Sequence, residues 1–210
     1  MNYLFKPPIV ILANGAFPIH PIPLIILVGA GTVICIDGSA NSLEALDLMP
    51  HIIIGDMDSF EETKSEFKGL KIHDPNHDNT DLEKALDWAV MNCIEDITIL
   101  GATGLREDMT LANHYILFDF FDKLNIEMVT DHFTITGHRG QKSFDSFPGE
   151  VVSLFPQRFG TVVSTTALKY PLNNTVLDPS ARAISNQSLG DTFSMNASEP
   201  ILVFRDHPQN

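Results

Sequence analysis

Short runs of apolar residues alternate with longer amphipathic segments up to about residue 130 of the chain. The apolar runs read IVIL, VICI, HIII, ITIL and IEMV, at residues 9–12, 33–36, 51–54, 97–100 and 126–129. Continuous apolar runs of this length are typical of strands buried on both faces of a parallel sheet. The pattern therefore predicts a parallel-sheet, Rossmann-like α/β domain, which we place at residues 1–131.

Two segments between these runs have the period of an amphipathic helix. TDLEKALDWAVMN, at residues 80–92, starts with a Thr80-x-x-Glu83 capping box. Its apolar stripe consists of Leu82, Ala85, Leu86 and Ala89. DMTLANHYILFDFFDKL, at residues 108–124, is predicted to bury Leu111, Tyr115, Phe118 and Phe121. Two further helix starts are predicted from Ser59-x-x-Glu62 and from the related pattern Asn41-x-x-Glu44.

The pattern changes after about His132. Segments become shorter, and turn sequences such as TGHRGQ, FPGE, YPLNN and SLGD come often. Alternation of apolar and polar residues appears in TFSMN and ILVFR. These features predict an antiparallel β-sandwich domain at residues 132–210.

Composition narrows the possible ligands and the compartment. The chain has 210 residues, a net charge of -14 and a pI near 4.7, which argues against nonspecific binding to nucleic acid or to an anionic membrane. A phosphate-bearing ligand would need its charge offset by something other than a basic surface, such as a divalent cation. The two cysteines have no CxxC spacing, the N-terminus does not have the pattern of a signal peptide, and the longest apolar run is too short to span a bilayer. We therefore expect a cytoplasmic protein with free thiols.

Acidic residues follow the predicted strands or begin the predicted helices. Asp37, Asp56 and Asp58 come directly after strands, whereas Asp81 and Asp108 lie at helix starts. Because ligands of open parallel sheets bind at the carboxyl ends of the strands, these residues belong to the edge where a ligand is expected. Asp81 or Asp108 alone could simply offset a helix dipole.

Dipole compensation does not explain the sequence GDMDS, which places Asp56 and Asp58 two positions apart around a turn. Their repulsion would be relieved by a hard divalent ion that takes carboxylate and phosphate oxygens as ligands. The spacing therefore predicts a Mg²⁺ site. No P-loop sequence occurs, and GATG at residues 101–104 is either a phosphate-binding loop or a tight turn.

Five motifs occur in an order that resembles the thiamine pyrophosphokinase family. They are ICIDGSANSL, IIIGDMDSF, DNTDLEKAL, GATGLREDMTLAN and ALKYPLNN…ISNQ. The resemblance implies a homodimer in which pyrophosphate is transferred from ATP to thiamine with the help of Mg²⁺. It extends over nearly the whole chain and across both predicted domains.

The resemblance also implies roles for individual residues. The metal ligands would be Asp56, Asp58 and Asp81, and the catalytic set would add Arg106 and Asp108. ATP would be bound by Asn14, Gly15, Asp37, Gly38, Asn41, Thr80, Lys84, Gly101, Thr103 and Arg106. Thiamine would be bound by Ser185 and Asn186, although without the resemblance a polar turn between strands would be the preferred explanation of these two residues. Arg106 could alternatively form a surface salt bridge with Glu107 or Asp108.

The chain departs from the usual family pattern at a few positions. Ser39 replaces the second glycine of DGGAN, Ala167 replaces the glycine of GLKYPL, and Leu105 and Met109 replace the second glycine and the histidine of GGRxDH. Two other functions fit an acidic cluster without a P-loop, namely a Mg²⁺-dependent phosphohydrolase and a non-catalytic nucleotide or thiamine sensor.

Overall fold

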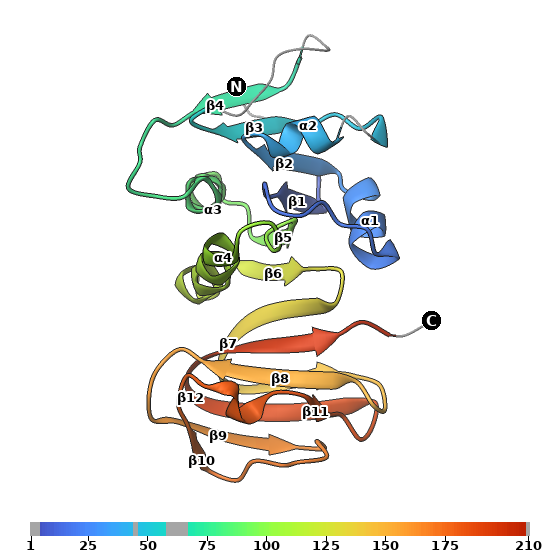
Figure 1. Cartoon of the computed structure of the whole chain (residues 1–210), viewed down its shortest axis with the longest axis vertical. Coiled ribbons are helices and arrows are strands. Elements are labelled where there is room, and N and C mark those ends of the chain that lie inside the picture. The colour runs from blue at the N-terminus through green and yellow to red at the C-terminus, as the bar shows by residue number, and fades with distance from the viewer. Residues whose placement is uncertain (1–4, 44–45, 58–66, 209–210) are drawn as a thin grey trace. The chain divides into compact units, whose positions relative to one another are not determined.

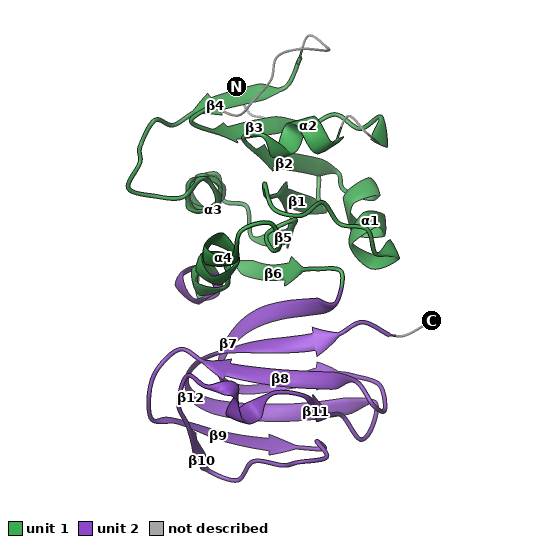
Figure 2. Cartoon of the chain, in the orientation of Figure 1, with its two compact units in different colours: residues 1–116, 122–131 green, residues 117–121, 132–210 purple. Residues whose placement is uncertain are grey.

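The computed structural model describes residues 5–43, 46–57 and 67–208, and the chain separates into two compact units (Figure 2). Unit 1 comprises Met1–Ile116 and Asp122–Asp131, and unit 2 comprises Leu117–Phe121 and His132–Asn210. The main division therefore falls where the sequence pattern changes, after residue 131. The segment 117–121 groups with unit 2 although the sequence places it inside the first predicted domain.

Unit 1 contains a parallel sheet with the strand order β6-β5-β1-β2-β3-β4 (Figure 1). All of its pairings along this path are parallel. The strands are β1 (Ile9–Leu12), β2 (Thr32–Ile36), β3 (Ile52–Gly55), β4 (Leu70–His73), β5 (Asp96–Leu100) and β6 (Asn125–Val129). The five predicted strands are confirmed, and β4 is an addition. Its sequence LKIH carried no continuous apolar run, because β4 is an edge strand that alternates between half-buried and exposed residues.

Among the residues that the structure describes, four helices accompany this sheet: α1 (Pro21–Val28), α2 (Ser39–Leu43), α3 (Asp81–Met91) and α4 (Glu107–Phe120). The capping box of α3 is confirmed, since Glu83 N–H donates to Thr80 Oγ1 at 3.3 Å and Thr80 N–H donates to Glu83 Oε2 at 2.7 Å. All four residues of its predicted apolar stripe are buried. Within the described residues, the helices are too short or too polar to cross a membrane.

The start of α2 differs from the prediction. The helix begins at Ser39, two residues before the Asn41 predicted to cap it. Ser39 Oγ accepts a hydrogen bond from Ile36 N–H at 3.0 Å and donates to Leu12 O at 2.7 Å, so this side chain ties the helix start to two strands. The other half of the predicted pattern, Glu44, and the Ser59 capping box lie outside the described residues.

The buried face of α4 was predicted incorrectly in part. Leu111 and Tyr115 are 61% and 50% exposed, whereas Ile116, Leu117 and Phe120 are buried, as is Phe118. Apolar residues occur around most of this helix, so the sequence period did not distinguish one face strongly. Packing decided the face.

The core of unit 1 lies between the central strands and their helices and includes Val10, Leu12, Leu27 and Ile53. Cys35 is part of this cluster, and its burial raises the pKa of the thiol to about 12. A thiol with such a pKa stays protonated and unreactive at neutral pH. Both cysteines are free, as predicted.

Unit 2 is antiparallel throughout its strand pairings. Its strands are β7 (Phe133–Asp145), β8 (Val151–Pro156), β9 (Thr161–Thr166), β10 (Thr175–Leu177), β11 (Asn186–Gln187) and β12 (Thr192–Asp206), with a short 3-10 helix, η2 (Ala181–Ala183). The long strand β12 pairs with β7 along most of its length, with β9 in its first half and with β8 in its second. The change of partner coincides with a register shift between Ala197 and Ile201.

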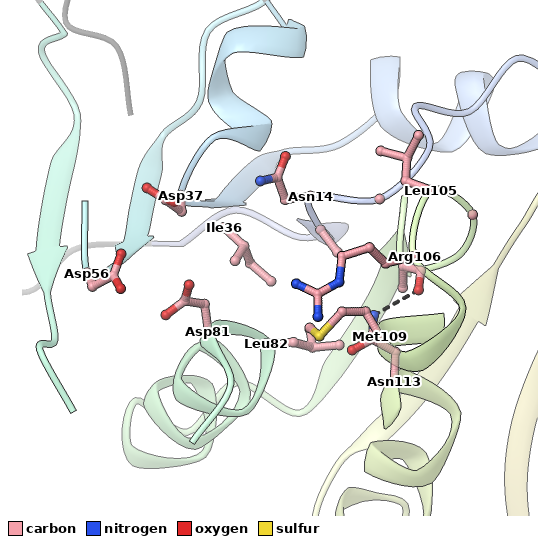
Figure 3. A pocket seen from close by; sticks show the side chains of 14 residues that line it. Asn14, Ile36, Asp37, Asp56, Asp81, Leu82, Leu105, Arg106, Met109 and Asn113 are labelled. Carbon is pink, nitrogen blue, oxygen red and sulfur yellow. Dashed lines mark hydrogen bonds between the residues drawn. The ribbon is translucent and has the colours of Figure 1, made fainter. Parts of the chain in front are cut away.

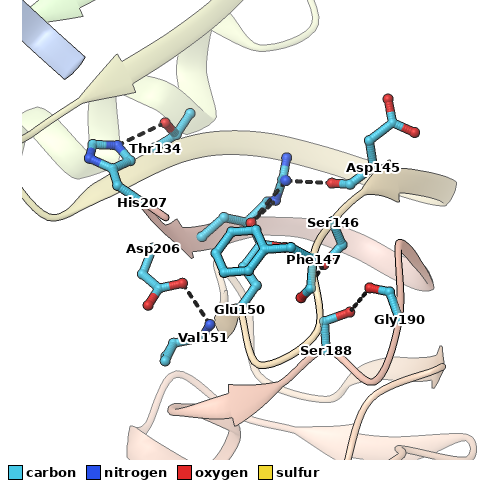
Figure 4. A network of polar contacts seen from close by, with 11 residues as sticks. Thr134, Asp145, Ser146, Phe147, Glu150, Val151, Ser188, Gly190, Asp206 and His207 are labelled. Carbon is cyan, nitrogen blue, oxygen red and sulfur yellow. Dashed lines mark hydrogen bonds and ion pairs between the residues drawn. The ribbon is translucent and has the colours of Figure 1, made fainter. Parts of the chain in front are cut away.

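One end of unit 2 contains a buried carboxylate in a polar network (Figure 4). Glu150 is 1% exposed and accepts hydrogen bonds from Ser146 Oγ and, at 2.9 Å, from Arg205 Nε. The Arg205 guanidinium also donates to Asp145 O and lies 5.7 Å from the ring centroid of Phe144. Because burying an unpaired charge is costly, these contacts offset the cost of burying the Glu150 carboxylate.

We expect His138 on β7 to make the stability of the folded chain depend on pH. Burial, together with the positive charges of Lys142 and Arg205, lowers the pKa of His138 from 6.5 to about 4. In the unfolded chain the imidazole would take up a proton near pH 6.5, whereas in the folded chain it stays neutral down to about pH 4. The unfolded state therefore binds more protons in this interval, and the free energy of unfolding should fall as the pH drops from about 6.5 to about 4.

Denaturant unfolding of His138→Gln at several pH values tests this expectation. The variant should lose part of the acid sensitivity between pH 6.5 and 4 that the wild type shows. His132→Gln is the matched control, since His132 is an exposed histidine of the same unit. Equal acid sensitivity in all three proteins would contradict the assignment to His138.

Candidate active site

Three aspartate carboxylates meet at the carboxyl edge of the parallel sheet in unit 1. Asp37 follows β2, Asp56 follows β3, and Asp81 is the first residue of α3. One carboxylate oxygen of each lies within 4.8 Å of those of the other two. All three line a cavity of ≈ 540 Å³ (Figure 3). Carboxylate oxygens at this spacing have the donor chemistry that a hard divalent cation requires.

The position of Asp37 depends on a close backbone approach. Asp37 is 5% exposed, has a φ of 42°, and its N–H donates to Ile54 O at 3.0 Å. A Cβ at position 55 would lie 3.1 Å from the Cβ of Asp37, so the glycine at the end of β3 provides the room. Asp37 was predicted only as an ATP-binding residue, and the structure makes it a candidate cation ligand as well.

Asp58, which was predicted as a metal ligand, lies outside the described residues. Asp56 and Asp81 thus belong both to the predicted set and to the observed cluster. The spacing rule that singled out Asp56 and Asp58 could not identify Asp37, because strands β2 and β3 become neighbours only in the folded sheet.

Lys84 partly balances the acidic cluster. Its Nζ lies 2.8 Å from Asp81 Oδ1 and donates to Asp74 O at 3.0 Å, and its side chain is 4% exposed. Lys84 was predicted to bind ATP. In this structure its ammonium group is used to orient Asp81, and Lys84 is not among the described residues that line the cavity.

Arg106 and Asp108 form an ion pair with two contacts, from Arg106 Nε to Asp108 Oδ1 at 3.1 Å and from Nη2 to Oδ2 at 2.6 Å. The hydrogen bond from Arg106 lowers the pKa of the Asp108 carboxyl. The hydrogen bond to Asp108 in turn raises the pKa of Arg106. Both side chains are largely exposed, and Arg106 but not Asp108 lines the cavity. The alternative reading of Arg106 as a salt-bridge partner of Asp108 is confirmed.

The GATG turn packs tightly against the loop that follows β1. A Cβ on Gly15 would lie 2.5 Å from Gly101 O and 2.6 Å from Thr103 O, so this crossing admits only glycine. The N–H of Gly104 donates to Thr110 Oγ1 at 3.1 Å, and that hydroxyl donates to Arg106 O at 2.9 Å. The turn is therefore held by the first turn of α4 as well as by Gly15.

Among the other residues predicted to bind ATP, Asn14 and Gly15 line the cavity. The rest of that set is not among the described residues that line the cavity; it comprises Gly38, Asn41, Thr80, Gly101 and Thr103. Thr80 acts as the N-cap of α3. The lining residues that sequence reasoning did not single out for binding include Leu82, Met109 and Asn113. Met109 and Asn113 are four residues apart on α4, a spacing that puts two side chains on one helix face.

Ser185 and Asn186, the predicted thiamine-binding residues, lie in unit 2. Asn186 is 8% exposed, and its amide accepts from Tyr170 N–H at 3.0 Å and donates to Tyr170 O at 2.7 Å. Ser185 has a φ of 56°, and its N–H donates to Ser153 Oγ at 2.9 Å. Asn186 thus fixes the loop that presents Tyr170, a side chain that is 61% exposed.

Leu105 occupies a strained backbone position beside the cavity. Its φ is 61°, in the left-handed region, and its side chain is 78% exposed. The left-handed conformation costs a residue with a Cβ about 1–2 kcal/mol, and glycine costs about 0.5–1 kcal/mol through its flexible unfolded state. Leu105→Gly should therefore raise the free energy of unfolding by about 0.5–1 kcal/mol. Urea denaturation measures this change.

Leu105→Ala is the matched control for strain. It removes the same apolar side chain but keeps the Cβ that causes the strain, so it should not stabilise the protein. A glycine variant no more stable than the alanine variant would show that the backbone at residue 105 carries no strain.

These features define a class of protein: an α/β protein with an acidic ligand cavity at the carboxyl edge of a parallel sheet. Residues 26–130 match the family described as thiamin pyrophosphokinase, catalytic domain. That match covers half of the chain, and the chain therefore belongs to the thiamin pyrophosphokinase family.

Individual relatives agree with this assignment. The chain is 29% identical over 195 residues to a thiamine pyrophosphokinase of Bacillus subtilis, with 84% of this chain and 83% of the relative covered. It is 27% identical over 157 residues to thiamin pyrophosphokinase 1 of Caenorhabditis elegans, with 68% of this chain but only 65% of the worm protein covered. Thiamin pyrophosphokinase is the enzyme function that the family and these relatives support.

Solved structures share the fold. A crystal structure of thiamine pyrophosphokinase from Bacillus subtilis has a TM-score of 0.82 at 23% identity, covering 96% of this chain and 99% of that chain. A thiamin pyrophosphokinase structure from Candida albicans has a TM-score of 0.83 at 17% identity, covering 95% of this chain and 89% of that chain. At these identities the likeness shows that the mixed α/β fold is common to the proteins.

Proposed function

We propose that this chain transfers the pyrophosphoryl group of ATP to the hydroxyl group of thiamine and releases AMP. The observation that carries the proposal is the meeting of Asp37, Asp56 and Asp81 on the wall of one cavity in a chain of this family. The cavity, at ≈ 540 Å³, lies within the ordinary size range of small-molecule sites. The hydrolase and sensor alternatives are not favoured, since the relatives are pyrophosphokinases.

The donor chemistry of the cluster fits Mg²⁺, because three carboxylate oxygens within 4.8 Å of one another are hard ligands of the right kind. We expect Asp56 and Asp81 to hold the ion, with Asp37 or Asp58 as a further ligand. When bound, Mg²⁺ neutralises charge on phosphate oxygens. Lys84 would keep Asp81 oriented toward the cavity through their 2.8 Å contact.

In the proposed reaction the hydroxyl oxygen of thiamine forms a bond to the β-phosphorus of ATP. The bond from that phosphorus to the oxygen of the α-phosphate breaks, so AMP leaves with that oxygen and the β- and γ-groups stay together. The hydroxyl proton passes to a carboxylate, for which Asp81 and Asp108 are the candidates. Since phosphoryl chemistry leaves a protein mainly positioning and charge stabilisation, the placement of the hydroxyl selects the phosphorus that is attacked.

Arg106 is the cation proposed to stabilise charge on the phosphates. Arg106 lines the cavity, whereas its partner Asp108 does not. A rotation of the exposed Arg106 side chain would replace its contact with Asp108 by a contact with a phosphate group.

The family resemblance supports the remaining assignments: ATP beside the Asn14–Gly15 loop, and thiamine held between two subunits of a homodimer near Ser185 and Asn186. We further propose a Rossmann-like ATP-binding domain, a β-sandwich thiamine-binding and dimerisation domain, and a cytoplasmic location, for which the two free thiols are the support.

Single-turnover incubation with ATP, Mg²⁺ and thiamine, followed by chromatography of the products, tests the function. Thiamine diphosphate and an equal amount of AMP are expected. ADP with thiamine monophosphate, or inorganic phosphate alone, would reject pyrophosphoryl transfer. Sedimentation of the active enzyme tests the homodimer, and a fully active monomer would contradict it.

A further inference from the structure

Asn113 on α4 presents a buried acceptor atom at the cavity. The residue is 6% exposed and lines the cavity (Figure 3). Its Nδ2 donates to Ala102 O at 2.8 Å. Its Oδ1 is buried, and no group in the described part of the chain donates a hydrogen bond to it. Buried side-chain oxygens in folded proteins nearly always have a donor, so this atom points to a ligand.

The fold fixes which end of the amide is available. A backbone carbonyl can accept a hydrogen bond but cannot donate one. Rotating the amide by half a turn would place Oδ1 against Ala102 O, where two acceptors would repel each other. Asn113 therefore offers the cavity an acceptor, and the matching ligand group must carry an N–H or an O–H.

The surroundings of Asn113 differ from those of the carboxylates. Figure 3 shows Asp37, Asp56 and Asp81 on one side of the cavity and Asn113 with Met109 on the other. Met109 precedes Asn113 by one helical turn, and Leu82 of α3 also lines the cavity. Leu82 and Met109 provide apolar contact suited to a flat ring, and a methionine sulfur interacts favourably with aromatic rings.

We propose that Asn113 Oδ1 accepts a hydrogen bond from the exocyclic amino group of adenine and makes the enzyme select ATP over nucleotides that lack this amine. The inference rests on the proposed function, which puts the triphosphate at the carboxylates. The base is the least polar part of ATP and lies at the opposite end from the γ-phosphate. The base would therefore lie on the side of the cavity with Asn113 and Met109, and the phosphates on the side with the three carboxylates. GTP and ITP carry a carbonyl oxygen at the corresponding ring position, and that oxygen would face another acceptor.

The test compares ATP with purine riboside 5′-triphosphate, which differs from ATP only by the missing amine. In the wild type, kcat/KM for thiamine diphosphate formation should be at least about tenfold higher with ATP. In Asn113→Leu, the ratio of the two kcat/KM values should fall to within about twofold of one. The ratio is measured within each protein, so a general loss of activity through a structural role of Asn113 would not change it.

Asn92→Leu is the matched control. Asn92 is an exposed residue at the end of α3 whose Nδ2 donates to a backbone carbonyl, Trp88 O, at 2.8 Å, as Asn113 does to Ala102 O. This variant should keep the wild-type preference for ATP. An unchanged ratio in Asn113→Leu would overturn the proposal. Equal use of both nucleotides by the wild type would also overturn it. This comparison uses the wild type alone, so it does not depend on whether the Asn113→Leu variant folds.

Thiamine also carries an amino group on an aromatic ring, and a second comparison separates the two sources. If Asn113→Leu loses discrimination between thiamine and 4′-deaminothiamine but keeps the preference for ATP, the nucleotide assignment is wrong. Calorimetric titration of the wild type with the two nucleotides, without thiamine, separates this proposal from the proposed function. Tighter binding of ATP supports Asn113 even where no thiamine diphosphate is formed.

Discussion

Asp56→Asn is expected to lower kcat/KM for thiamine diphosphate formation by about 10²–10³-fold. Asp56 is one of three carboxylates whose oxygens lie within 4.8 Å of one another, and an amide is a weaker and uncharged ligand for a divalent ion. The fold should tolerate the change, because removing one of several mutually repelling charges does not weaken packing. Steady-state rates over a Mg²⁺ titration, with urea denaturation of the same samples, measure both effects.

Asp87→Asn serves as the control for Asp56→Asn, since Asp87 lies on α3 but outside the acidic cluster. Its activity should stay close to that of the wild type. Near-normal turnover of Asp56→Asn at low Mg²⁺ would contradict the metal assignment. The same titration with Asp58→Asn tests the sequence prediction for a residue outside the described part of the chain, and this variant should have no turnover.

Arg205→Met is expected to lower the free energy of unfolding by about 3 kcal/mol, because it leaves a buried carboxylate without its cation. Glu150 has a side chain that is 2% exposed and lies 2.9 Å from Arg205. Methionine preserves an apolar stem near the stacked rings of Phe144 and Phe193, whose centroids are 4.8 Å apart. The loss therefore reports mainly on the charge. Urea denaturation at neutral pH measures it.

Two comparisons isolate this charge effect. Arg158→Met removes an exposed ion pair with Glu199, whose atoms lie 3.8 Å apart, and should change stability by no more than about 0.5 kcal/mol. Adding Glu150→Gln to Arg205→Met should recover part of the lost stability, because the buried charge is then absent. Equal destabilisation by Arg205→Met and Arg158→Met would mean that Glu150 does not depend on its partner.

The sequence predicted the position of a candidate site residue correctly where the pattern that identifies it lies within one helix or strand. The capping box that placed Asp81 at the start of α3 is local, and so is the strand end that placed Asp56. The side chain of Lys84 could not be assigned in this way, because a lysine three residues after an aspartate on a helix can either bind a ligand or bind that aspartate. In the structure Lys84 is buried against Asp74 O and its ammonium group binds Asp81, so the second possibility holds.

The acceptor of Asn113 could not be found from sequence for a related reason. An asparagine in the middle of a helix has no local pattern that indicates whether its amide is satisfied. Only the approach of Ala102 O to Nδ2 leaves Oδ1 as the end that faces the cavity. The same holds for the buried face of α4, where apolar residues on several sides left the choice to packing.

The sequence by itself determined the order and type of the main strands and the long helices. It also determined the family and the change, after His132, to short segments separated by turns. Those features follow from hydrophobic period, turn residues and local motifs, all of which act between residues close together in the chain. The tertiary structure decided that Asp37 joins Asp56 and Asp81, that Arg205 neutralises Glu150, and that Asn113 offers an oxygen. Each of these is a contact between different elements, and its partner is fixed only when the strands pair and the helices pack.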